Sequence, residues 1–331
     1  MFCLHYHNFK IALVSIASFI FGCIFTFNIL EIDNENSFNG FESALELKTD
    51  NTKLFNSLQY FLIIVVISSA DNLARRKAIR ETWALLAKED ELVKCYFVIG
   101  SKGLSSNKIL ELTKEQIKYN DLFLLSVPDD YSNLSTKVLQ ALVWFEREFN
   151  FNYILKCDDD SFVNVPKITK ELKSRLLKIH NLYWGFFDGR AHVKRGGKWE
   201  EQEWLLCDRY LPYALGGGYV LSQPLVHFIY ENADNLSLYS SEDVSVGAWL
   251  SPLNITRHHD IRFDTEYLSR GCSNEYLITH KKSPHDMYFI YKTLETTGKL
   301  CEKEVKLRKS YQYNWKVPPT LCCLRNDTIP F

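Results

Sequence analysis

The stretch YFLIIVVI, from Tyr60 to Ile67, decides the fold that we predict for this chain of 331 residues. It is continuously apolar and rich in β-branched residues, which is typical of a strand buried on both faces of a parallel sheet. Further apolar runs at 95–99, 122–127 and 151–157 alternate with helical patterns at 74–86, 107–118 and 136–149. Such alternation predicts an α/β domain with a mainly parallel central sheet.

The first helical pattern has a clear apolar face. Ile79, Trp83 and Leu86 are spaced at i, i+4 and i+7. This spacing predicts one continuous amphipathic helix that packs against the sheet. Ligands of open α/β sheets bind beyond the carboxyl ends of the strands. We therefore expect functional residues directly after the strand at 151–157.

Composition and charge exclude several classes of protein. Hydrophobic residues make up 46% of the chain and charged residues 24%, which excludes a disordered or low-complexity chain. The 39 Lys and Arg residues balance 40 Asp and Glu residues, so we expect no nucleic-acid partner. No G-x-G-x-x-G motif follows the first strand and no P-loop motif is present, which argues against a dinucleotide cofactor and a P-loop nucleotide site.

The N-terminal region predicts a membrane anchor. Residues 11–30 carry no charged side chain, and Lys10 precedes them while Glu31 follows. At about 1.5 Å per residue, a helix of this length crosses the roughly 30 Å hydrocarbon core of a membrane. The charge asymmetry predicts a single-pass type II protein with a cytosolic tail at 1–10, a transmembrane signal-anchor at 11–30, a stem at 31–56 and a lumenal domain at 57–331. A cleaved signal peptide is the alternative, although its apolar region is normally only about 7–15 residues long.

Sequons and cysteines fit a lumenal domain. Glycosylation sequons of the Asn-x-Ser/Thr type begin at Asn133, Asn235, Asn254 and Asn326. Beyond the predicted anchor, cysteines stand at positions 95, 157, 207, 272, 301, 322 and 323. Because their number is odd, at least one is free or pairs with another chain, and the sequence leaves the pairing open. We expect Cys157, which lies in a strand, to be a buried thiol.

Three consecutive carboxylates, Asp158, Asp159 and Asp160, end the predicted strand at 151–157. In an extended backbone the first and third point to one side and the second to the other. Two carboxylates on one side suit a hard divalent cation such as Mg²⁺ or Mn²⁺, which commonly also bridges substrate phosphates. The alternative is an acidic turn that caps the next helix.

Three later features are candidates for the same site. The glycine run 216–218 indicates either close approach of the backbone to a sugar or a tight turn before a strand. Glu242 and Asp243 either begin a capped helix or supply a general base near the cation. His280 is either an ordinary packed histidine or a third metal ligand, and a nitrogen ligand would favour Mn²⁺.

In order and spacing, these motifs resemble the β1,3-galactosyltransferase family. They are RRKAIRETW at 75–83, YFVIG at 96–100, DDDSF at 158–162 and EDVSVG at 242–247. Longer strings are similar to the branch of that family that builds the linkage region of proteoglycans. These are LYWGFFDGRAHVKRGGKW at 182–199, LPYALGGGYVLS at 211–222 and RFDTEYLSRGCSNEYLITHKKS at 262–283.

The resemblance implies a GT-A nucleotide-sugar transferase fold, a UDP-galactose donor, Mn²⁺ and an inverting reaction in the Golgi membrane. The acceptor it implies is the galactose 3-hydroxyl of Gal-β1,4-Xyl-O-Ser on galactosyl-xylosyl proteoglycan core proteins. The residue roles it implies are Asp243 as catalytic base; Asp158, Asp160 and His280 as metal ligands; and Arg76, Arg80 and Asp159 as donor-binding residues.

The acceptor side is predicted from residue type. Candidates for stacking on sugar faces are Trp184, Trp199 and Tyr213, with burial in the core as the alternative. Gly217 and Glu242 are further candidates for acceptor binding. Two other functions stay open from the sequence. One is a transferase of the same family that acts on N- or O-linked glycans or glycolipids. The other is a lumenal protein that binds glycans without chemistry.

Overall fold

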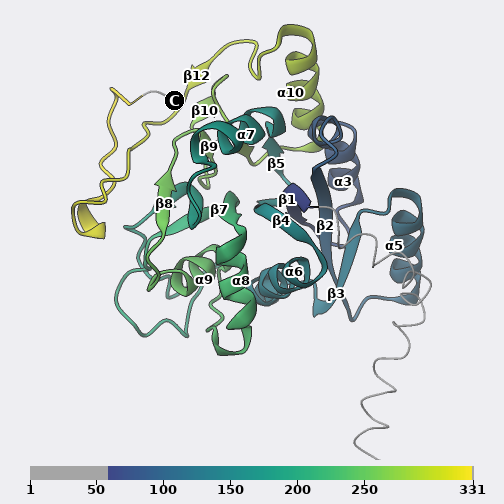
Figure 1. Ribbon diagram of the computed structural model, residues 1–331, viewed down its shortest axis with the longest axis horizontal. Coiled ribbons are helices and arrows are strands. Elements are labelled where there is room, and N and C mark those ends of the chain that lie inside the picture. The colour runs from purple at the N-terminus through teal and green to yellow at the C-terminus, as the bar shows by residue number, and fades with distance from the viewer. Residues whose placement is uncertain (1–58, 330–331) are drawn as a thin grey trace, which may run out of the picture. The chain divides into compact units, whose positions relative to one another are not determined.

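The centre of the fold is a seven-stranded sheet with strand order β3-β2-β1-β4-β7-β6-β8 (Figure 1). It is seen in a computed structural model that describes residues 59–329. The strands of this sheet are β1 (Gln59–Ile67), β2 (Val93–Lys102), β3 (Leu122–Pro128), β4 (Asn150–Asp158), β6 (Leu182–Asp188), β7 (Tyr213–Ser222) and β8 (Thr256–His259).

Strand β1 explains why the sheet is mainly parallel. Its neighbours β2 and β4 both run parallel to it, and β3 is parallel to β2. Every residue from Tyr60 to Ile67 is buried, because the strand is covered on both faces. The predicted parallel sheet is confirmed, and the structure adds β7, which runs antiparallel to both β4 and β6.

Helices cover both faces of the sheet. They are α3 (Leu73–Arg80), α4 (Trp83–Ala87), α5 (Ser106–Tyr119), α6 (Leu134–Glu148), α7 (Val165–Glu171), α8 (Gln223–Glu231), α9 (Glu242–Trp249) and α10 (Pro284–Thr297). Short 3₁₀ turns lie at Tyr131–Asn133, Ala233–Asn235 and Pro319–Leu321, and a π-helical turn at Leu172–Leu176. Figure 1 shows α6, α8 and α9 together on one side of the sheet and α3, α7 and α10 on the other. The helical patterns at 107–118 and 136–149 are confirmed as α5 and α6.

The prediction of one continuous helix over 74–86 is wrong. The chain leaves helical geometry at Thr82, whose φ and ψ are -128° and -112°, and this break separates α3 from α4. The Thr82 hydroxyl donates to the carbonyl of Ala78 at 2.6 Å, a local bond that competes with helix continuation. Ile79 and Trp83 are nevertheless fully buried, so the apolar spacing identified core residues correctly.

Two smaller sheets complete the strands. One contains β5 (Ser161–Val163), β11 (Ile278–His280) and β9 (Phe263–Asp264), and the other pairs β10 (Gly271–Cys272) with β12 (Val305–Lys306). In the first of these sheets, His280 pairs with Ser161. Because Ser161 directly follows the acidic triplet, this register brings the distant histidine to the end of β4.

Disulfides join Cys272 to Cys301 and Cys322 to its neighbour Cys323. Cys95, Cys157 and Cys207 are free thiols. Cys157 is fully buried in β4, which confirms the expectation for this residue.

The sequons occupy different environments. Asn235, Asn254 and Asn326 are exposed. Asn133 is half-buried, and its amide donates to Asp130 at 2.9 Å. No helix within residues 59–329 is long and apolar enough to cross a membrane. The predicted cytosolic tail, signal-anchor and stem all lie outside the described residues.

Candidate active site

The acidic triplet lies where the order of the parallel strands reverses. The chain runs from β1 outward through β2 and β3 and then returns to β4 on the other side of β1. Ile67, the last residue of β1, pairs with Asp158, the last residue of β4. The loops that follow these two strands therefore meet at the carboxyl edge of the sheet, which is where open α/β sheets bind ligands.

Asp158, Asp160 and His280 form one cluster of candidate metal ligands. One ligand atom from each residue lies within 4.8 Å of the other two. Nε2 of His280 is 3.1 Å from Oδ1 of Asp160 and 3.6 Å from Oδ2 of Asp158. The sequence prediction that Asp158 and Asp160 point to the same side is thus confirmed.

The donor atoms of this cluster fit a divalent cation. Oδ1 of Asp160 is buried, and no group in the described part of the chain donates a hydrogen bond to it in good geometry. Burial works to raise the pKa of Asp160, but His280 and Arg75 outweigh it and lower that pKa below the ordinary value. An ionised carboxylate whose buried oxygen accepts no hydrogen bond in good geometry, beside a second carboxylate and an imidazole, is a donor set suited to Mn²⁺.

Asp159 points the other way and holds the loop that follows β1. Its carboxylate accepts hydrogen bonds from Ser68 at 2.8 Å, from Asn72 at 2.8 Å and from Arg75 at 2.7 Å. The side chain is buried. The alternative that the triplet caps the next helix is wrong, because α7 is capped by the side chain of Asn164.

Arg76 and Arg80 form buried ion pairs within the fold. Arg76 binds Glu115 through Nε at 2.9 Å and through a second nitrogen at 2.8 Å, and it is 1% exposed. Arg80 binds both Glu115 and Asp121. These two guanidinium groups attach α3 to α5 and to the start of β3. Arg76 is linked to the triplet indirectly, because it donates at 3.2 Å to the Ser68 hydroxyl, which in turn donates to Asp159.

Arg75 is the arginine that reaches the triplet. It binds Asp159 at 2.7 Å and lies 3.5 Å from Oδ2 of Asp160. Sequence reasoning placed Arg75 in the first motif but did not select it as a site residue. The helical direction of α3 decides which of the adjacent arginines faces the site, and residue type carries no signal for this.

The glycine run lies inside strand β7, so the turn alternative is wrong. A Cβ at Gly216 would lie 2.7 Å from Oε1 of Glu242, and one at Gly217 would lie 2.9 Å from Cγ of His280. The backbone amide of Gly216 donates to Oδ2 of Asp243 at 2.9 Å. These contacts confirm that the backbone of the glycine run lies very close to other groups. Those groups belong to two acidic clusters, namely the metal-ligand cluster with His280 and the pair of Glu242 and Asp243.

Lys156 joins the two acidic clusters. Its ammonium donates to Oδ1 of Asp158 at 2.9 Å, to the carbonyl of Gly216 at 2.7 Å and to the carboxylate of Glu242. The metal-ligand cluster and the Glu242–Asp243 pair therefore belong to one site. Lys156 was missed at the sequence level, although its position two residues before Asp158 places both side chains on one face of the strand.

Glu242 and Asp243 have different environments at the start of α9. Glu242 is buried, and it accepts hydrogen bonds from Lys156 and from the Tyr219 hydroxyl, the latter at 2.9 Å. Burial raises the pKa of Glu242 to about 7. Asp243 is half-buried, and burial raises its pKa despite the opposing effect of Lys156 and of two backbone amides. Asp243 is therefore the acid of this pair with access to a substrate, and a carboxylate of raised pKa is well suited to accept a proton.

Among the predicted acceptor-binding residues, Trp184 lies in the core. It has no exposed surface, its indole nitrogen donates to Asp260 at 3.0 Å, and its ring packs on Phe263. A ring enclosed in this way has no face for a sugar, so the core alternative holds. Tyr213 is also buried, in a cluster with Trp204 and Tyr210.

Trp199 and Tyr267 form an exposed aromatic pair. Their ring centroids are 5.2 Å apart, and 36% and 61% of the two residues are exposed. The ammonium of Lys281, the residue after His280, lies 3.9 Å from the centre of the Tyr267 ring. Lys198 approaches the ring of Tyr131, whose hydroxyl is 3.5 Å from that of Ser241. The segment around 198–199 thus contacts neighbours of both acidic clusters.

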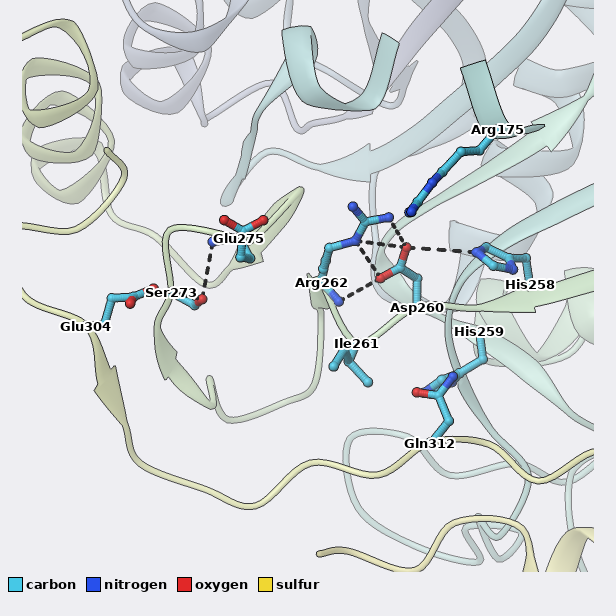
Figure 2. Close-up of a pocket in the computed structure, with 10 residues that line it drawn as sticks. All are labelled: Arg175, His258, His259, Asp260, Ile261, Arg262, Ser273, Glu275, Glu304 and Gln312. Carbon is cyan, nitrogen blue, oxygen red and sulfur yellow. Dashed lines mark hydrogen bonds and ion pairs between the residues drawn. The ribbon is translucent and has the colours of Figure 1, made fainter. Parts of the chain in front are cut away.

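A separate cavity of about 510 Å³ lies away from these residues (Figure 2). Its lining includes Arg175, His258, Asp260, Arg262, Glu275 and Glu304. Within this lining Arg262 binds Asp260 at 2.8 Å, and it also binds Glu171 at 2.7 Å. None of the predicted site residues lines it.

Comparisons with known proteins agree with the motifs. The galactosyltransferase family model matches residues 74–262. Beta-1,3-galactosyltransferase 6 of Mus musculus is 48% identical over 276 residues, which are 82% of this chain and 84% of that relative. UDP-GalNAc:beta-1,3-N-acetylgalactosaminyltransferase 2 of Xenopus tropicalis is 31% identical over 58% of this chain and 39% of that relative. The chain, with its glycosyltransferase-like α/β fold, therefore belongs to the galactosyltransferase family and is a glycosyltransferase.

Proposed function

We propose that this protein transfers galactose from UDP-galactose to the 3-hydroxyl of galactose in Gal-β1,4-Xyl-O-Ser of the glycosaminoglycan–protein linkage region, with inversion. One observation carries the proposal: Lys156 and Gly216 join the metal-ligand cluster to the Glu242–Asp243 pair in one site. Similarity to the mouse β1,3-galactosyltransferase over 84% of its length supports the donor sugar and the linkage. The linkage-region acceptor is supported by the strings at 182–199, 211–222 and 262–283.

In this proposal Asp158, Asp160 and His280 hold Mn²⁺. When bound there, Mn²⁺ neutralises negative charge on the departing UDP. Arg75 lies beside the same carboxylates and supplies a positive charge toward the diphosphate. Asp159 supports this arrangement because it holds Arg75 and the loop after β1 in place.

The reaction needs one base and no protein nucleophile, because inversion requires a single displacement. The acceptor hydroxyl oxygen forms a bond to the anomeric carbon while the bond from that carbon to UDP breaks. Asp243 takes the hydroxyl proton through its carboxylate. Gly216 and Val244 donate their backbone amides to Asp243, each at 2.9 Å, and so fix its orientation.

The exposed pair of Trp199 and Tyr267 provides the acceptor surface in this proposal. Aromatic rings at the rim of a polar site offer an apolar face on which the C–H face of a pyranose packs. In this proposal the pair lies next to the catalytic centre. Tyr267 is three residues after β9, and β9 pairs with β11, the strand that ends at His280. Gly217 then acts indirectly, because it lies against the imidazole of His280, and Glu242 acts indirectly through its contact with Lys156.

The proposal includes a Golgi membrane location as a single-pass type II protein with its catalytic domain in the lumen. Support comes from the uncharged segment 11–30 and from the sequons.

A donor and acceptor screen on the full-length chain in detergent tests the function. We expect galactose transfer from UDP-galactose to a galactosyl-β1,4-xyloside, dependent on Mn²⁺, with a Gal-β1,3-Gal product identified by NMR. Transfer to N-acetylglucosamine-terminated or lipid acceptors instead would assign a different acceptor class within the family. Binding of glycans with no consumption of UDP-galactose would reject the enzymatic proposal.

A further inference from the structure

The ammonium of Lys156 is the central contact between three elements of the fold. Lys156 lies on β4 and is 1% exposed. An ammonium has three donors. Here they meet Oδ1 of Asp158 at the end of β4, the carbonyl of Gly216 on β7, and the carboxylate of Glu242 on α9. All three donors of the ammonium are therefore used. Two of them connect one acidic cluster to the other, and the third binds the backbone between them at Gly216.

Lys156 is linked to Asp243 through two residues that it contacts, Gly216 and Glu242. Gly216 accepts from Lys156 through its carbonyl and donates its own amide to Oδ2 of Asp243 at 2.9 Å. Glu242 precedes Asp243 in the first turn of α9. Its second carboxylate oxygen accepts from the Tyr219 hydroxyl at 2.9 Å, so both oxygens of this buried carboxylate are bound to groups of the fold. The position of Asp243 thus depends on two groups that Lys156 holds.

We propose that Lys156 and Glu242 are positioning residues that keep the base Asp243 in register with the metal-ligand carboxylate Asp158. This inference rests on the proposed function. Transfer requires the acceptor oxygen, held at the base, to meet the anomeric carbon, held by the donor-binding acids. A misplacement of about 1 Å between such groups costs on the order of 100-fold in rate. A buried ion pair that contacts both groups limits such displacement.

The competing explanation is that Lys156 and Glu242 only stabilise the fold. A double variant that removes both charges distinguishes this explanation from the positioning role. Lys156→Met leaves the buried carboxylate of Glu242 without its counter-charge, which destabilises any fold. The double variant Lys156→Met with Glu242→Gln removes both charges and keeps the side-chain volumes similar. If the pair serves only stability, this double variant restores stability and turnover together. If the pair positions the base, stability returns and turnover does not.

The experiment compares wild type, Lys156→Met, the double variant and Ile229→Ala in the full-length protein. Ile229 is fully buried in α8 outside both clusters, so its variant serves as a destabilised control with an intact site. Thermal unfolding, calorimetric binding of UDP with Mn²⁺, and the kcat and KM for UDP-galactose are measured for each protein. We expect the double variant to recover thermal stability relative to Lys156→Met and to bind UDP within about threefold of wild type, with kcat about 100-fold lower. The Ile229→Ala control loses stability but keeps its kcat.

The outcomes are distinct. A double variant with wild-type kcat overturns the positioning role, and so does a loss confined to the KM for UDP-galactose or to UDP affinity. Failure of every protein with Lys156 replaced to fold also rejects it in favour of a structural role. A wild-type protein that consumes no UDP-galactose rejects the proposed function itself, which is a separate result.

Discussion

His280 and Asp160 meet with 3.1 Å between Nε2 and Oδ1, although they lie on strands far apart in the sequence. The register of β11 against β5 produces this contact, because it pairs His280 with Ser161 next to the triplet. Gly217 on β7 lies against the imidazole, where any Cβ would approach within 2.9 Å of Cγ. The imidazole is thus held in place from two strands, which makes the cluster of Asp158, Asp160 and His280 testable as a unit.

Replacement of Asp160 tests the metal cluster. We expect Asp160→Ala to abolish the Mn²⁺-dependent part of UDP binding and His280→Ala to weaken it about 10- to 100-fold, because each removes one donor atom. Calorimetric titration of UDP with and without Mn²⁺ measures this. His258→Ala is the control, since that histidine lines the separate cavity of Figure 2. Unchanged Mn²⁺-dependent binding in Asp160→Ala would falsify the ligand assignment.

Replacement of Asp243 tests the base. Asp243→Asn keeps the shape and one acceptor oxygen but cannot take a proton. We expect kcat to fall about 100- to 10,000-fold while UDP binding with Mn²⁺ stays close to wild type. Steady-state kinetics and calorimetry on the same preparation separate the two effects. Near-normal turnover in this variant would show that another group accepts the proton.

The pH dependence of kcat follows from the same carboxylate. Burial raises the pKa of Asp243 above the 3.8 of an ordinary aspartic acid. A base works when it is deprotonated, so kcat falls as the pH drops through this raised pKa and is maintained above it. A pH profile of wild type should show this acid limb at a higher pH than an ordinary aspartic acid would produce, and the residual activity of Asp243→Asn should lack it. An identical limb in both proteins would assign the ionisation to another group.

Replacement of the adjacent arginines Arg75 and Arg76 should have opposite effects on fold stability and on UDP binding. Arg76→Met leaves Glu115 buried with one partner fewer, and we expect a loss of about 3–5 kcal/mol in the free energy of unfolding with little change in UDP affinity. The side chain of Arg75 is 38% exposed, so Arg75→Met should cost less than about 1 kcal/mol in stability. It should, however, weaken UDP binding. Denaturant unfolding and UDP titration measure both quantities, and a stable Arg76→Met protein with weak UDP binding would support the donor-binding role that the family resemblance implies for Arg76.

The exposed aromatic pair is tested through the acceptor. Trp199→Ala and Tyr267→Ala should each raise the KM for a galactosyl-xyloside about 5- to 10-fold, because each removes part of an apolar face worth on the order of 1 kcal/mol. The KM for UDP-galactose should stay unchanged. Trp315→Ala is the matched control, since Trp315 is 43% exposed and stacks on Tyr313. Equal effects of all three variants would remove Trp199 and Tyr267 from the acceptor surface.

Local sequence pattern predicted much of the fold and part of the site. The alternation of apolar runs with amphipathic helices identified β1 to β4, α5 and α6, because burial on both faces of a parallel sheet demands uniformly apolar strands. The prediction that Asp158 and Asp160 share one side and Asp159 faces the other is correct, although β4 ends at Asp158 and the other two carboxylates lie in the turn after it. Periodicity could not detect the break at Thr82, which depends on a hydroxyl-to-backbone bond that apolar spacing does not report.

The parallel half of the sheet, its core residues and the acidic end of β4 are readable from local sequence, because periodicity and burial are properties of neighbouring residues. The three-dimensional fold was needed to show that β7 runs antiparallel beside β4, that Lys156 joins Asp158 to Glu242, and that Arg75 rather than Arg76 binds the triplet directly. It also enclosed Trp184 in the core and left Trp199 exposed. The physical reason is that such contacts join residues from different elements, and their distances depend on strand register and helix direction, which no local pattern contains.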